Sequence, residues 1–206
     1  GGAGNDALSG GTGMDTVVIS STTALTFGRD GAGKLTITGT EGTDTVLDGV
    51  ETVQHGGQKF VVIDAANGGL TLDAAITAAG AGDVLVTGQA LALTVAQAQA
   101  VLAKGASFHV GDTVTIVDSA AAIYGNASAL FNANGTTAAG LNIDGVTVKS
   151  DGLNVGAVTV AEAATLLARV GNDSALTMTL NVAAGSETLK AAHCSLEISG
   201  SSVFPV

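Results

Sequence analysis

The chain has 206 residues, 46% of them hydrophobic, and 7 basic against 18 acidic residues give it a formal net charge of −11. This length and hydrophobic content suffice to bury a core, which excludes a disordered tail. The acidic charge repels phosphate backbones and anionic lipid surfaces, so nucleic acid is not an expected partner.

The composition also limits how the fold can be stabilised. One cysteine excludes an internal disulfide framework and a cysteine-rich zinc site. The excess of carboxylates leaves many acids without an ion pair, and a divalent cation, above all calcium, is the simplest way to neutralise them. No stretch is long and apolar enough for a membrane span, and the N-terminus lacks the features of a cleavable signal peptide.

The chain opens with two glycine-rich units of nine residues, GGAGNDALS at 1–9 and GGTGMDTVV at 10–18. Glycines permit positive φ, so the first six residues of each unit can turn tightly and direct carbonyl oxygens inward, where the aspartate adds a charged oxygen. The last three residues predict a short strand with its apolar member inside. A weaker third copy, GTEGTDTVL, occupies 39–47 and contains an additional acid.

These units resemble the calcium-binding nonapeptide repeats of the RTX (repeats-in-toxin) family. The resemblance covers residues 1 to about 66 and implies a parallel β-roll, in which two nonapeptides form one turn and calcium lies between successive turns. The residues expected at metal sites are Gly2, Gly4, Asp6, Gly11, Gly13, Asp15, Glu41, Gly42 and Asp44. The alternative is a Gly/Asp-rich turn that binds no metal.

In such a roll, Asp6 and Asp15 face opposite edges, and each needs a neighbour about 18 residues away, because two nonapeptides make a turn. Either the roll continues upstream of residue 1, or the segment through Asp44 folds back and closes one site. In both alternatives the opening repeat is one half of a cation-binding stack.

The segment between the second and third copies, TTALTFGRDGAGKLTITG, predicts a β-hairpin that turns at Asp30 and Gly31. The following GTDTVLDGVETVQHGGQKFVVID is expected to be an acidic loop that leads to a second strand pair. A hairpin followed by such a segment is similar to the closing portion of RTX blocks.

From about residue 67 the composition shifts to Ala, Thr, Val and Leu. LTVAQAQAVLAKG at 93–105 recurs as VTVAEAATLLARVG at 158–171, and each copy has a capping box, a basic last turn and a terminal glycine. These features predict helices of about ten residues, each entered from a strand. Weaker copies begin at Leu70, Val114 and Met178, and the junctions fit a period of about 22 residues with one degenerate unit between 117 and 160.

The sequence therefore predicts a mainly β fold with short helices, in which a β-roll over 1–66 is followed by a strand–helix solenoid over 67–206. The solenoid region resembles repeats of very large secreted bacterial surface proteins. An irregular α+β domain is the alternative for this second part.

The residues with reactive side chains form no recognisable catalytic motif. His55, His109 and His193 are scattered, as is typical of surface or edge residues, and Cys194 is interpreted as a buried structural thiol. Asp118 is the best candidate for a helix cap. Ligand binding along a solenoid groove lacks an aromatic platform, since aromatic residues make up only 3%. We expect no enzymatic activity.

The expected function is that of a calcium-dependent structural module of a secreted bacterial cell-surface, S-layer-like, matrix or adhesin protein. Its expected partners are calcium ions, with self-assembly or other cell-surface components as candidates. The alternative is the C-terminal folding and type I secretion module of an RTX exoenzyme, a protease or lipase whose catalytic domain lies upstream. The tail SLEISGSSVFPV is interpreted as a secretion signal or, alternatively, as a terminal strand.

Overall fold

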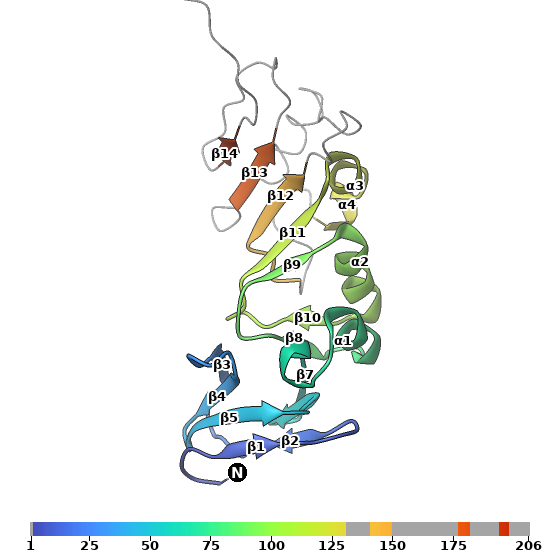
Figure 1. The fold of residues 1–206 in the computed structure, drawn as a ribbon. Coiled ribbons are helices and arrows are strands. Elements are labelled where there is room, and N and C mark those ends of the chain that lie inside the picture. The colour runs from blue at the N-terminus through green and yellow to red at the C-terminus, as the bar shows by residue number, and fades with distance from the viewer. Residues whose placement is uncertain (1, 131–140, 150–176, 182–193, 198–206) are drawn as a thin grey trace, which may run out of the picture. The chain divides into compact units, whose positions relative to one another are not determined.

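The computed structural model describes residues 2–130, 141–149, 177–181 and 194–197. Over these residues the chain is mainly β with short helices, as predicted (Figure 1). Its contacts form two compact units. The first comprises 1–91, 100–113 and 140–142, and the second comprises 92–99, 114–139 and 143–206. The expected roll segment, residues 1–66, lies within the first unit, which also includes residues 67–91.

The described elements are short. The strands of the first unit are β1 (Ala7–Ser9), β2 (Thr16–Val18), β3 (Thr26–Arg29), β4 (Leu35–Gly39), β5 (Gly42–Asp48), β6 (Thr52–His55), β7 (Gln58–Val62), β8 (Val84–Val86) and β10 (Ser107–Phe108). Its helices are the 3-10 helix η1 (Ala65–Asn67) and α1 (Leu72–Ala78). Residues of both units occur in β9 (Leu91–Leu93) and α2 (Val95–Lys104). The second unit contains β11 (Val114–Ser119), α3 (Ala120–Gly125), α4 (Ala127–Leu130), β12 (Gly145–Lys149), β13 (Thr177–Asn181) and β14 (Cys194–Glu197).

Two sheets organise the first unit, with strand orders β1-β5-β4-β3 and β10-β8-β7-β6-β2. The strands of the first two nonapeptides, β1 and β2, pair in parallel with β5 and β6. Each of them therefore lies at the edge of a different sheet. The hairpins β3–β4 and β6–β7 are antiparallel, whereas β7, β8 and β10 pair in parallel.

The predicted hairpin is confirmed. Strands β3 and β4 pair antiparallel, and the turn between them is closed by a hydrogen bond from Asp30 N to Lys34 O of 2.9 Å. The alternating apolar residues of the hairpin enter the core of the first unit because successive side chains of a strand point to opposite faces. This core consists of Leu8, Leu25, Phe27, Leu35, Ile37, Val46, Val50, Val53, Phe60, Val62 and Val86.

The segment after the hairpin corrects the sequence prediction. Residues 42–48 form strand β5 instead of an acidic loop. This strand pairs with β4 on one side and with β1 on the other, so its backbone groups have partners on both sides despite the acidic side chains. The expected second strand pair follows as β6 and β7.

The helix predicted over 93–105 is confirmed as α2, and its ends show the expected caps. Thr94 N donates to Gln97 Oε1 at 2.9 Å, and Gln97 N donates to Thr94 Oγ1 at 3.2 Å, which is a capping box. Lys104 lies in the last turn, and the helix is followed by Gly105 with φ of 66°. The second copy of this pattern, 158–171, lies outside the described residues.

The third sheet has the order β14-β13-β12-β11-β9. Its strands from β11 to β14 pair in parallel, and the partner residues are 30, 32 and 16 positions apart, as in Thr115 with Gly145, Gly145 with Thr177 and Met178 with Cys194. These spacings differ from the expected period of about 22 residues with one degenerate unit between 117 and 160. The pairings of β8 with β7 and β10, 24 and 23 residues apart, come close to it. The neighbouring strands β9 and β11 match it, since Leu91 N donates to Thr113 O, 22 residues away, at 2.8 Å.

The expected strand-to-helix junction after Val114 is present as β11 and α3, but its cap differs from the prediction. Ser119 Oγ accepts from Ala122 N at 3.2 Å, so the hydroxyl of Ser119 caps α3. Asp118 instead accepts from Ser119 N at 2.7 Å and from Val95 N, at the start of α2, at 2.9 Å. A capping pattern covers only a few consecutive residues, so it could not predict this contact between residues 23 positions apart.

The predicted secretion signal falls mostly on 198–206, which lie outside the described residues. Residues 194–197 form a strand.

Candidate functional site

The first nonapeptide lies directly beside the third. In the β1–β5 ladder, Ala7 pairs with Thr45, and the glycine-rich turns that precede these strands are hydrogen-bonded as well. Gly4 N donates to Glu41 O at 2.7 Å, and Thr45 N donates to Asp6 O at 2.8 Å. The hairpin β3–β4 is thus inserted between two copies that stack in space.

Glycine is required where these copies touch. A Cβ on Gly42, whose φ is 141°, would lie 2.0 Å from Gly4 O. A Cβ on Gly49, whose φ is 53°, would lie 2.1 Å from Gly11 O in the second nonapeptide. Both positions combine the left-handed region of φ with a backbone approach that leaves no room for a side chain.

Two carboxylates meet at the first edge of this stack. Asp44 is 8% exposed, and its Oδ1 accepts from Asp6 N at 3.0 Å. Asp44 and Glu41 line a small cavity of about 30 Å³ together with Gly2 and residues 18–20. The carboxylate of Asp6 is used elsewhere, since its Oδ2 accepts from Gly2 N at 2.9 Å. We call this set, Gly2, Glu41, Asp44 and residues 18–20, the first edge site.

The second edge pairs Asp15 with a residue that the sequence analysis missed. Glu51 is 3% exposed, and its Oε2 accepts from Asp15 N at 2.7 Å, while Asp15 O accepts from Glu51 N and Thr52 N at 3.2 and 3.1 Å. Asp15 Oδ2 is buried and has no hydrogen-bond partner among the described residues. We call Asp15 and Glu51 the second edge site.

A sequence signal for Glu51 exists. Residues 15–17 and 44–46 both read Asp-Thr-Val, and residues 51–53 read Glu-Thr-Val. These residues are a degenerate fourth unit. A search for the nonapeptide misses it because Glu replaces Asp and the preceding segment has a single glycine.

The nine predicted metal-site residues therefore fall into two groups. Gly2, Gly4, Asp6, Glu41, Gly42 and Asp44 lie at or next to the first edge site, and Gly11, Gly13 and Asp15 lie at or next to the second. The neighbours of Asp6 and Asp15 are Asp44 and Glu51, 38 and 36 residues away, instead of the 18 expected. The inserted hairpin accounts for the difference. Of the two alternatives left open by the sequence, the structure places the segment through Asp44 against the first copy.

The donor set at the edges fits a hard cation such as calcium, which prefers carboxylate and carbonyl oxygens. A cavity of about 30 Å³ has room for one particle of the size of a water molecule. Across the described residues, no three carboxylate, imidazole or thiol side chains are grouped closely enough to hold a metal alone. A cation at either edge would therefore need backbone carbonyl oxygens, which the glycine-rich turns carry.

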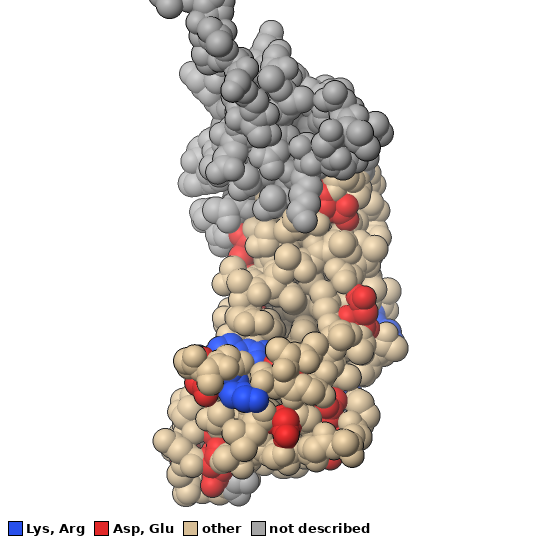
Figure 2. All heavy atoms as spheres, viewed as in Figure 1, with Lys and Arg blue, Asp and Glu red and all other residues tan. Residues whose placement is uncertain are grey.

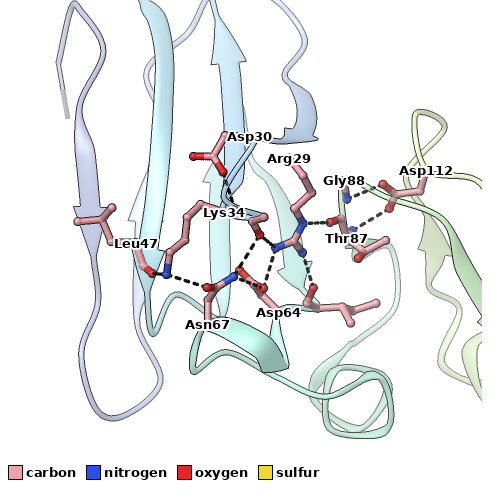
Figure 3. Close-up of polar contacts among 11 residues, drawn as sticks. Arg29, Asp30, Lys34, Leu47, Asp64, Asn67, Thr87, Gly88 and Asp112 are labelled. Carbon is pink, nitrogen blue, oxygen red and sulfur yellow. Dashed lines mark hydrogen bonds and ion pairs between the residues drawn. The ribbon is translucent and has the colours of Figure 1, made fainter.

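A buried polar network fixes the hairpin to the following strands (Figure 3). Arg29 forms an ion pair of 2.7 Å with Asp64 and donates to Ile63 O at 3.1 Å and to Thr87 O at 2.8 Å. The side chains of Arg29 and Asp64 are only 11% and 4% exposed. Asn67 Nδ2 adds a bond of 2.9 Å to the same carboxylate oxygen. These contacts hold β3 against the segments that follow β7 and β8.

Asp112 extends this network on the side of β8. It accepts from Thr87 N at 2.8 Å and from Gly88 N at 2.7 Å (Figure 3). Burial raises the pKa of Asp112 above its ordinary value of 3.8, while the two backbone hydrogen bonds and the charges of His109 and Arg29 oppose that rise.

On the face in Figure 2, acidic side chains are scattered, basic ones occur in fewer places, and most of the described surface is neutral. In the part of the chain that the structure describes, none of the helices has the length and apolar character required to cross a membrane.

Comparison with protein-family models, with curated proteins and with solved structures finds no match for this chain.

Proposed function

We propose that residues 1–66 form the closing turns of an RTX-like parallel β-roll, that each edge site binds calcium, and that the chain is a calcium-ordered structural module of a secreted bacterial surface protein. The observation that carries this proposal is the stacking of the first nonapeptide on the third. It brings Glu41 and Asp44 to one small polar cavity. The Asp44 carboxylate already accepts from Asp6 N, but a turn that needed no metal would gain nothing from a second carboxylate, that of Glu41, beside it.

Electrostatics support a cation at these positions. Bringing carboxylates together in a partly buried place costs free energy unless a positive charge compensates them. The ion pairs of Arg29 with Asp64 and of Lys59 with Asp83 do not involve an edge site. Calcium would supply the missing charge, and the buried, unpartnered Asp15 Oδ2 is a ready ligand at the second edge site.

The same chemistry links calcium to location. The roll would be ordered by the millimolar calcium outside cells, whereas the low calcium of the cytoplasm would leave the acidic chain unfolded and exportable. The strand–helix solenoid proposed for residues 67–206 would then extend from the ordered roll as a spacer or assembly element. The parallel pairing of β7, β8 and β10 and of β11 to β14 supports a solenoid.

Calorimetric titration of the full chain with calcium tests the proposal. We expect binding in the micromolar to millimolar range and a gain of β structure by circular dichroism. Asp44→Asn should lower the affinity of one site about tenfold or more, because it removes a charged ligand. Asp73→Asn, which removes an exposed carboxylate in α1, is the matched control and should bind as the wild type does. An unchanged spectrum and melting temperature after EDTA treatment would refute the proposal.

A second measurement separates the surface role from that of an export module. Calcium-dependent growth of large assemblies, followed by light scattering, is expected of a surface-layer or matrix protein. A chain that folds with calcium but stays monomeric at all concentrations would favour the exoenzyme module instead.

A further inference from the structure

The first unit contains a second, larger cavity that shares no residue with the edge sites. It has a volume of about 440 Å³ and lies between the hairpin start at Leu25, strands β6 and β7, and β10. We call it the apolar pocket. Its floor is formed by Leu25, Phe60 and Phe108, which are 5%, 8% and 1% exposed. Volumes of 300–1,000 Å³ with mostly apolar walls are typical of small-molecule sites.

Aromatic side chains make the wall of this pocket rigid. The ring of Phe27 lies behind it, with its centroid 5.1 Å from that of Phe60 and 5.0 Å from that of His109. His109 also lies edge-on to Phe60, and its Nδ1 accepts from Gly111 N at 3.1 Å, which fixes the orientation of the imidazole. The described phenylalanines of this aromatic-poor chain thus gather at one place, which composition alone did not predict.

The lining carries no formal charge on Asp, Glu, Lys or Arg, although the chain has a net charge of −11. Its polar groups include the amides of Gln58 and Asn142. Gln58 Nε2 donates to Gly82 O at 2.7 Å, and Asn142 Nδ2 donates to Phe108 O. Within the described residues the two amide oxygens accept no hydrogen bond, so they offer acceptors to a donor group of a ligand. His109 Nε2 and the Ser107 hydroxyl add donors to the lining, because His109 Nδ1 accepts from Gly111 N and the ring proton is then on Nε2.

Asn142 adds an observation on the backbone. It is the one non-glycine among the described residues with a positive φ, 49°. Asparagine tolerates this region better than most residues, yet such conformations concentrate at ligand sites. Here the conformation accompanies the bond that holds Asn142 against β10.

We propose that the apolar pocket binds a small uncharged molecule with an apolar body of one or two rings, or an aliphatic chain of similar volume, and one hydrogen-bond donor. An anion or a cation would lose its hydration without a carboxylate, lysine or arginine in the pocket to compensate its charge. The apolar body replaces water against Leu25, Phe60 and Phe108, and the donor bonds to an amide oxygen of Gln58 or Asn142. This inference does not depend on calcium at the edge sites.

The neutral dye N-phenyl-1-naphthylamine, which has two aromatic groups and one N–H donor, is a suitable probe for the full chain in calcium buffer. We expect its fluorescence to rise on binding, with saturation at one dye per chain. Val110 lines the pocket and is 81% exposed, so Val110→Asp leaves the core intact while placing a charge beside the dye. It should weaken binding about tenfold or more.

Leu47→Asp is the matched control, because Leu47 is also an exposed apolar residue, 42% exposed, and lines neither the apolar pocket nor an edge site. It should bind the dye as the wild type does. Absence of saturable binding overturns the proposal. So does binding that Val110→Asp leaves unchanged, or that both variants weaken equally, because the dye then binds elsewhere.

Discussion

Gly42→Ala tests the stacking of the nonapeptides most directly. The new Cβ would lie 2.0 Å from Gly4 O, where ordinary contacts begin at 3.4 Å, and the φ of 141° is one that alanine rarely adopts. Backbone strain costs about 1–3 kcal/mol. Separation of the two turns would also break the bonds from Gly4 N to Glu41 O and from Thr43 N to Asn5 Oδ1, at about 1 kcal/mol each. We expect a total loss of about 3–5 kcal/mol.

For a domain of this size, such a loss lowers the melting temperature by roughly 6–20 °C. Thermal unfolding followed by circular dichroism in calcium buffer measures it. Gly31→Ala is the control, since Gly31 has no positive φ and open space around its Cβ, and it should change stability by less than about 0.5 kcal/mol. If Gly42→Ala melts like Gly31→Ala, the first and third nonapeptides do not stack as described.

Three further changes have defined outcomes. Arg29→Met leaves the buried carboxylate of Asp64 unpaired and should cost about 3–5 kcal/mol in urea unfolding; a loss below 1 kcal/mol would mean that the pair is open to water. Because the folded pKa of Asp112 is raised, its contribution to stability is greatest below pH 3.8 and declines as the pH rises through the folded pKa. The free energy of unfolding of the wild type minus that of Asp112→Asn should therefore fall with rising pH, and a difference that rises would show the wrong sign. Thr94→Ala removes the capping box with Gln97 and should destabilise α2 by about 1 kcal/mol, measured by hydrogen exchange of its first amides; unchanged exchange would contradict the cap.

Local features were predictable from the sequence because their hydrogen bonds close within a few residues. The hairpin around Asp30 and the helix that starts after Thr94 are of this kind. The hairpin needs only a turn residue and the helix only a cap, each together with an apolar periodicity. These signals lie within short stretches of consecutive residues.

The partners of strands were not predictable in the same way. The sequence identified Asp6, Asp15 and Asp44 as acids of repeated units, but the inserted hairpin decides which unit lies beside which. As a result, Glu51 lies beside Asp15. Residues 42–48, which were expected to be a loop, form a strand with partners on both sides.

The sequence by itself determined a mainly β chain with short helices, its glycine-rich acidic repeats and the ends of its capped helix. Only the tertiary structure decided that Asp118 bonds to Val95 instead of capping its own helix, and that Phe60, Phe108 and His109 meet around one pocket. The physical reason is the distance along the chain over which each kind of interaction acts. Propensity and capping act over about one turn of chain, whereas the pairing of distant strands depends on every loop between them.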